Sequence, residues 1–190
     1  SYFQHNEGTL RSLHYMMLDY DIGKHPGRWR PGSIHVRREP DNAIVYEGPS
    51  ADLIPELMAE LITSLNAASP LPVMVRAALA HLNLVMIHPF RDGNGRASRL
   101  LFLLACYHCG IEAGRYISLE RLIEENKERY YEVLEQSSRR WHEGKHDPWP
   151  YIGYLLFILK QAYKEFEERV GQVDAPKGEK TEVVMNALRK

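Results

Sequence analysis

Twelve residues near the middle of the chain carry side chains suited to chemistry on a phosphate. The stretch from His88 to Arg99 reads HPFRDGNGRASR. An imidazole that titrates near neutral pH suits a general base that takes a proton from an attacking hydroxyl, and we assign this role to His88. A carboxylate beside phosphates commonly holds Mg²⁺, which makes Asp92 the candidate metal ligand.

The second half of the stretch has the pattern of an anion site. Backbone amides of Gly93, Asn94 and Gly95 would lie at the N-terminus of the following helix, and helix N-termini bind anions. Arg96 and Arg99 are three residues apart, so both can face the same anion. The pattern therefore predicts a loop that holds a polyphosphate. A solvated turn between helices is the plainer alternative, and the presence of all these residues together argues against it.

Two buried helices must position this loop. Apolar runs at 84–87 and 100–104 flank it, and the second helix should end at Gly110, a usual residue after a helix C-terminus. Cys106 and Cys109 stand in that helix without a second cysteine pair, so we interpret them as core thiols rather than a zinc site. Reduced cysteines fit a cytoplasmic protein.

The remaining pattern predicts an all-α fold with one β-hairpin. Thr9 is the expected cap of a first helix, and Asp147-Pro148 is the expected start of the last long one. The expected strands are Ile34–Arg37 and Ala43–Tyr46, joined by a turn at 40–42. The other expected helices are 52–66, 72–88 and 118–141, and the last long helix should bury Ile152, Leu155, Leu159 and Phe166.

Composition places few further limits on function. The chain has 190 residues, 44% of them hydrophobic and 26% charged, which suits a globular domain. A formal net charge of −1 gives no electrostatic reason to expect nucleic acid or an anionic membrane as a partner. The longest apolar runs, such as 151–159, are too short to span a bilayer.

The stretch resembles the signature of Fic domains, His-x-Phe-x-(Asp/Glu)-Gly-Asn-Gly-Arg-x-x-Arg, and matches it at every fixed position. The resemblance extends over roughly residues 9 to 170. It implies a Fic-type helical bundle that transfers AMP from ATP, with Mg²⁺, to a Ser, Thr or Tyr hydroxyl of a target protein and of itself. The implied roles are general base for His88, Mg²⁺ ligand for Asp92, anion hole for Gly93, Asn94 and Gly95, outer-phosphate ligands for Arg96 and Arg99, and buried loop anchor for Phe90.

The resemblance also assigns roles outside the signature. The related Doc kinases carry Lys at the position of Gly95, so Gly95 favours nucleotidyl transfer over phosphorylation. Residues Ala43, Ile44, Val45 and Tyr46 match the flap that holds the target segment, and an exposed strand edge can pair with an extended peptide. A surface hairpin without a role is the alternative. Tyr130 matches a position near the adenine, whereas Tyr131 is expected in the core. Ser138 stands where many relatives have Asn, which leaves other nucleotides open as donors.

Regulation and the chain ends are matters of expectation. Many Fic proteins carry an inhibitory helix, (Ser/Thr)-x-x-x-Glu-(Gly/Asn); Glu7-Gly8 matches its end, but Phe3 stands where Ser or Thr belongs. We expect that helix upstream, in a separate protein, or absent. The Fic domain should cover 1–170, with a linker at 171–180 and, capped by Thr181, the start of a helix at 181–190. In related proteins a winged-helix domain often follows there.

The expected partners are the nucleotide and a target protein on the flap, with DNA only through such a further domain, and a homodimer is left open. The alternatives are transfer of another nucleotide, removal of AMP, or a nucleotide-sensing module of a DNA-binding regulator.

Overall fold

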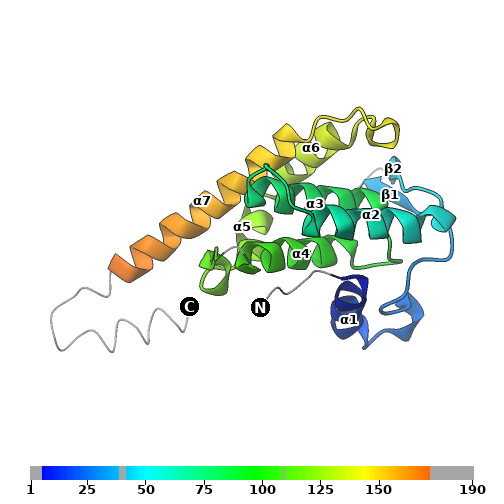
Figure 1. Cartoon of the computed structure of the whole chain (residues 1–190), viewed down its shortest axis with the longest axis horizontal. Helices are drawn as coiled ribbons and strands as arrows, with labels where there is room; N and C mark the ends of the chain where they lie inside the picture. The colour runs from blue at the N-terminus through cyan, green and yellow to red at the C-terminus, as the bar shows by residue number, and fades with distance from the viewer. Residues whose placement is uncertain (1–5, 39–41, 109, 172–190) are drawn as a thin grey trace.

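The computed structural model describes residues 6–38, 42–108 and 110–171, and this part of the chain forms a helical bundle with one hairpin (Figure 1). The predicted all-α class with a single hairpin is confirmed. The helices and strands are α1 (Glu7–Leu18), β1 (His35–Arg38), β2 (Ala43–Glu47), α2 (Ile54–Asn66), α3 (Val73–Ile87), α4 (Asn94–His108), α5 (Leu119–Glu125), α6 (Lys127–Ser138) and α7 (Trp149–Gly171).

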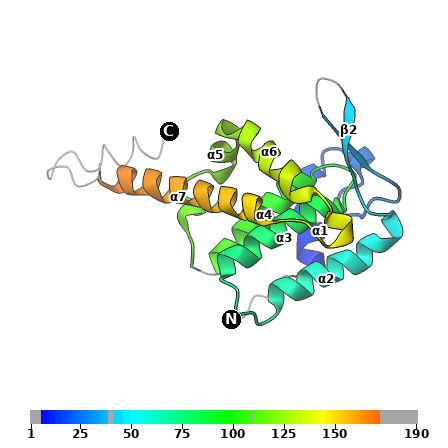
Figure 2. The same ribbon diagram turned by 90° about the horizontal axis from the view of Figure 1, so that it is seen from above.

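Helix α3 lies at the centre of the bundle because it is apolar on nearly every side. It packs against α2, α4 and α7, and most of its side chains from Ala77 to Ile87 are buried. The hairpin stands out from the helices, as Figure 2 shows. Its strands are antiparallel, with Val36 opposite Tyr46, and its turn at 39–41 lies outside the described residues. The loop from His88 to Gly93 therefore joins the most buried helix to α4.

Local capping differs from the prediction at the first helix. The expected cap, Thr9, lies within α1, and Asn6 is the cap: its side-chain oxygen accepts a hydrogen bond from the Thr9 amide at 2.7 Å. Both residue types cap helices well, and Asn6 adds most of a turn to α1. The Asp147 carboxylate accepts from the Trp149 amide at 3.0 Å, as expected of a capping residue, but α7 begins at Trp149 rather than at Pro148.

The expected helix at 118–141 is two helices and a short turn. Asn126 separates α5 from α6, since its side-chain amide donates to the Leu122 carbonyl at 2.9 Å and competes with the helical bond. A 3₁₀ turn, η4 (Trp141–Glu143), follows α6. In α7, Ile152, Leu155 and Leu159 are buried as predicted and Phe166 is half-buried.

The structure describes some of the residues that follow α4 and α7, where the sequence predicted a glycine stop and a linker. Gly110, with φ of +76°, follows α4 as predicted, and Cys106 is buried. Gly171 ends α7 rather than opening a linker, whereas Cys109 and residues 172–190 lie outside the described part of the chain. Within the described residues, no helix combines the length and apolar character needed to cross a membrane.

Candidate functional site

His88 occupies the point where α3 reverses direction. It has φ of 50° and ψ of 55°, a left-handed conformation, and its amide donates to the Leu84 carbonyl at 3.0 Å. Its ring nitrogen Nδ1 lies 3.1 Å from the Val85 carbonyl, so Nδ1 carries the hydrogen and Nε2 keeps its lone pair. Burial lowers the pKa of His88 below its usual value, which keeps the ring neutral at pH 7. A neutral ring with Nε2 as acceptor is the form that a general base needs.

The loop after His88 is held from inside by Asn94. The Asn94 side chain accepts from the Phe90 amide at 2.8 Å and donates to the Phe90 carbonyl at 2.9 Å. Phe90 is fully buried, as expected of an anchor, and stacks on the ring of His14 with centroids 3.6 Å apart. Both polar atoms of the Asn94 side chain are therefore used to hold the loop.

Gly93 allows the backbone to make the turn, and Gly95 leaves room beside the Arg99 side chain. Gly93 has φ of +77°, and a Cβ there would lie 3.0 Å from Leu18 Cδ1. A Cβ at Gly95 would lie 3.3 Å from Arg99 Nη1, so Gly95 and the Arg99 guanidinium share one side of α4. The Gly93 amide donates to Asp92 Oδ1 at 2.6 Å, whereas the first amides of an α-helix have no partner within the helix.

The two signature arginines have different surroundings. Arg99 binds Glu120 of α5 through Nε and Nη2, with 2.6 Å between Nη2 and Oε1. Arg96 instead contributes its charge to two neighbours: the pKa of Asp92 is lowered mainly by the bond from Lys24 and that of His14 mainly by burial, and Arg96 adds to both. Glu120 was missed by the sequence reasoning, because an acidic residue just after the cap Ser118 is a usual feature of helix starts.

Asp92 also has a partner that the sequence did not single out. Lys24, in the short 3₁₀ turn η1 (Ile22–Lys24), places its Nζ 2.5 Å from Asp92 Oδ2. The bond from Lys24 is the main reason why the pKa of Asp92 lies below its usual value. In the described part of the chain, no cluster of three or more His, Cys, Asp or Glu side chains could hold a metal by itself.

Of the two adjacent tyrosines in α6, one is buried and the other is exposed, and the exposed one is Tyr131. Tyr131 is 57% exposed, so its expected place in the core is wrong, whereas Tyr130 is 5% exposed and packs on Tyr151 and Tyr154. Neighbouring helical residues point about 100° apart, so only one of the pair can face α7. The burial of Tyr130 leaves little of its ring available for stacking on a base.

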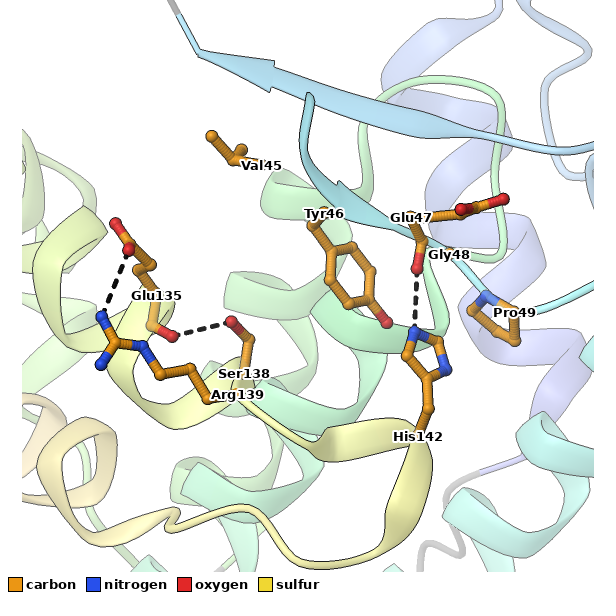
Figure 3. A pocket seen from close by; sticks show the side chains of 9 residues that line it. All are labelled: Val45, Tyr46, Glu47, Gly48, Pro49, Glu135, Ser138, Arg139 and His142. Carbon is orange, nitrogen blue, oxygen red and sulfur yellow. Dashed lines mark hydrogen bonds and ion pairs between the residues drawn. The ribbon is translucent and has the colours of Figure 1, made fainter. Parts of the chain in front are cut away.

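A cavity of about 510 Å³ lies between the hairpin and the end of α6 (Figure 3). Tyr46 donates from its hydroxyl to the Met86 carbonyl at 2.6 Å, and its ring stacks with that of His142. His142 donates from Nε2 to the Glu47 carbonyl at 2.9 Å. Ile44 and Val45 are half-exposed. No signature residue lines the cavity, whose lining residues are Val45, Tyr46, Glu47, Gly48, Pro49, Glu135, Ser138, Arg139 and His142.

The sequence matches a protein-family model and several characterised proteins. The family model described as Fic/DOC family matches residues 4–106. The chain is 36% identical over 103 residues to "Protein adenylyltransferase fic-1" of Caenorhabditis elegans, covering 53% of this chain and 19% of that protein. It is 51% identical over 93 residues to "Protein adenylyltransferase Fic" of Drosophila ananassae, covering 48% and 18%. The chain thus spans about a fifth of the length of these relatives.

Solved structures share the fold. A Fic family protein from Desulfovibrio desulfuricans G20 matches with a TM-score of 0.71 and 27% identity, over 97% of this chain and 57% of that one. Fic-1 (residues 134–508) from C. elegans matches with a TM-score of 0.61 and 25% identity, over 88% and 44%. With more than half of its length matched by the family model, the chain belongs to the Fic/DOC family.

Proposed function

We propose that this chain transfers AMP from Mg-ATP to a hydroxyl of a protein, its own hydroxyls included. The observation that carries the proposal is the state of His88: a neutral ring whose Nε2 keeps its lone pair, in the loop that opens α4. The names of the matched relatives, protein adenylyltransferases, support the same reaction.

The reaction needs one proton transfer and one in-line displacement. Nε2 of His88 takes the proton of a Ser, Thr or Tyr hydroxyl, and the oxygen attacks the α-phosphorus. The bond from the α-phosphorus to the oxygen that bridges it to the β-phosphate breaks, and pyrophosphate leaves. The amides at the start of α4 hold phosphate oxygens, and Arg96 and Arg99 stabilise the charge that develops on the leaving pyrophosphate.

The loop also fits a magnesium ion. Mg²⁺ is usually held by one or two carboxylates together with substrate phosphates and waters, and Asp92 is such a single, half-exposed carboxylate. The ammonium of Lys24 pairs with this carboxylate at 2.5 Å, and Mg²⁺ would take its place when the nucleotide binds. Asp92 would hold the ion, which would neutralise charge on the phosphates.

The hairpin is the proposed dock for the target. The side chains of Ile44 and Val45 are half-exposed, and a strand edge binds extended peptides through main-chain hydrogen bonds. Tyr46 and His142 fix the end of β2 to α3 and to η4. A peptide paired with β2 would therefore be held at a fixed place relative to the end of α3, where His88 lies.

Transfer from a nucleoside triphosphate other than ATP is the second candidate function, and the residue at position 138 supports it. Serine lacks the side-chain amide that many relatives have at this position, and the Ser138 hydroxyl is already bonded to the Glu135 carbonyl at 2.9 Å. The burial of Tyr130 removes a stacking surface as well.

Mass spectrometry of the purified protein after incubation with Mg²⁺ and each nucleoside triphosphate in turn tests both candidates. We expect a gain of one AMP unit with ATP, its loss in His88→Ala, and its retention in the control His108→Ala, which changes an exposed histidine of α4. A UMP or GMP unit in place of AMP would favour the second candidate. Modification that survives His88→Ala would contradict the mechanism.

A further inference from the structure

Arg30 is buried among backbone carbonyls, with no carboxylate partner in the described part of the chain. It is 4% exposed, although a buried arginine is usually paired with an acid. Its Nε donates to the His88 carbonyl at 2.8 Å, Nη1 to the Gly32 carbonyl at 2.5 Å, and Nη2 to the Pro49 carbonyl at 2.5 Å. A longer contact of 3.5 Å joins Nη2 to the Ile87 carbonyl.

These carbonyls belong to three separate parts of the molecule. His88 and Ile87 end α3, Gly32 precedes β1, and Pro49 follows β2 at the end of the flap. The guanidinium is planar, and its donors point in fixed directions, so one side chain holds all three parts in one geometry. The Arg30 amide adds a bond of 2.8 Å to the Pro89 carbonyl, one residue beyond His88.

The bond to His88 bears directly on the shape of the site. His88 has φ of 50°, and a non-glycine residue is strained in this left-handed region, so the surroundings must hold it there. Arg30 binds the carbonyl of that same residue. Its positive charge also contributes to the low pKa of His88, after burial.

We infer that Arg30 is a positioning residue, which fixes the end of the flap relative to His88 so that a hydroxyl presented on β2 meets Nε2. The inference rests on the proposed function, because one of its tests measures the rate of AMP transfer. Arg30 does not meet substrate in this role. It acts through the backbone of His88 and of Pro49.

Arg76 provides a control for a purely structural role. Its Nη2 donates to carbonyls at the end of α2, including Ala67 at 2.6 Å, but it touches neither the flap nor His88. Lysine keeps the charge at either position and loses the planar fork. Arg30→Lys and Arg76→Lys thus remove the same kind of contact from two helix ends.

Gly48 allows the junction to be disturbed without changing Arg30. A Cβ at Gly48 would lie 3.0 Å from Arg30 Nη2 and 2.8 Å from Ile34 Cγ2. Gly48→Ala therefore displaces the guanidinium from the flap side, and it serves as the second variant if Arg30→Lys does not fold.

The experiment measures the affinity for Mg-ATP by calorimetry and the rate of self-modification at saturating Mg-ATP. We expect Arg30→Lys and Gly48→Ala to lower the rate on the order of 100-fold, the loss typical of a misplaced reacting group, and to leave the affinity unchanged. Arg76→Lys should change neither quantity. An unchanged rate in a folded Arg30→Lys or Gly48→Ala protein, or an affinity that falls in step with the rate, would overturn the inference.

The ring signals of His88 in NMR spectra separate this inference from the proposed function. We expect these signals to shift in Arg30→Lys and Gly48→Ala and to stay in place in Arg76→Lys, whether or not the wild type transfers AMP. Absence of transfer by the wild type would count against the proposed function alone. Unmoved His88 signals in both folded variants would overturn the role of Arg30.

Discussion

Two side chains proposed to meet the nucleotide already have partners of the opposite charge. The carboxylate of Glu120 binds Arg99 where a phosphate would, and the ammonium of Lys24 binds Asp92 where Mg²⁺ would. Both pairs are partly open to solvent, and such pairs contribute about 1 kcal/mol or less. A triphosphate with Mg²⁺ can therefore replace both partners at a small cost.

Glu120→Gln tests that cost. Removal of the carboxylate should raise the affinity for Mg-ATP by up to about fivefold, because roughly 1 kcal/mol no longer opposes binding. Calorimetry measures the change, and Glu124→Gln is the control, since Glu124 lies on the same helix and pairs with Lys127. An unchanged or weaker affinity in Glu120→Gln would contradict the competition between the Glu120 carboxylate and the phosphates for Arg99.

Asp92→Ala tests the metal role. The wild type should bind ATP more tightly with Mg²⁺ than without it, and the variant should lose most of this difference while it keeps its melting temperature, because the carboxylate is half-exposed. Asp52→Ala, in an exposed turn with Ser50, is the control. A variant that still responds fully to Mg²⁺ would remove Asp92 from the metal site.

At the scale of elements, α1 supports the signature loop through one histidine. His14 is fully buried; its Nδ1 accepts from the Gly27 amide at 2.9 Å, and its Nε2 donates to the Asp92 carbonyl at 2.9 Å. Both bonds need a neutral ring, and burial lowers the pKa of His14. Burial likewise lowers the pKa of His81, in α3, to about 3.

These shifts predict a loss of stability in acid. In the unfolded chain these histidines have a pKa near 6.5, whereas the buried rings of the folded protein stay neutral to lower pH. Their contribution to the free energy of unfolding is therefore complete above pH 6.5 and decreases as the pH falls, for His81 down to about pH 3. Urea denaturation from pH 7.5 to 4.5 should show a falling free energy of unfolding. In His14→Asn this free energy should be lower at pH 7.5 and decline less steeply. An equal slope in that variant would contradict the role of His14.

The sequence predicted elements better than the contacts between them. Periodicity and caps are local signals, which is why α3, α4, the hairpin and the start of α7 were correct. The exposure of Tyr131 depends on where α7 lies, and the choice of Asn6 over Thr9 depends on how far α1 extends. Arg30 and His88 are 58 positions apart, and no spacing rule connects residues at that distance.

At the scale of the whole molecule, the hairpin and the C-terminal end of α7 at Gly171 lie at opposite ends of the long axis (Figure 1). The side chains proposed to meet the nucleotide and the target, from Ala43 to Ser138, all precede the end of α7 at Gly171. Shortening the chain after Gly171 should therefore leave the melting temperature and the affinity for Mg-ATP unchanged, as thermal denaturation and calorimetry will show. A weaker affinity in the shortened chain would contradict the proposed domain boundary near residue 170.

The hydrogen bond from Tyr46 to the Met86 carbonyl ties the hairpin to the last turn of α3. Within an α-helix, the Met86 carbonyl would accept from the amide of residue 90, but that amide binds the Asn94 side chain instead. The Tyr46 hydroxyl donates to the Met86 carbonyl instead. If the hairpin moves away from the helices, this carbonyl loses its hydrogen bond inside the bundle. Opening of the hairpin and fraying of the last turn of α3 should then be one cooperative event. In hydrogen exchange, the amides of both should lose protection together in Tyr46→Phe, before the rest of α3 does.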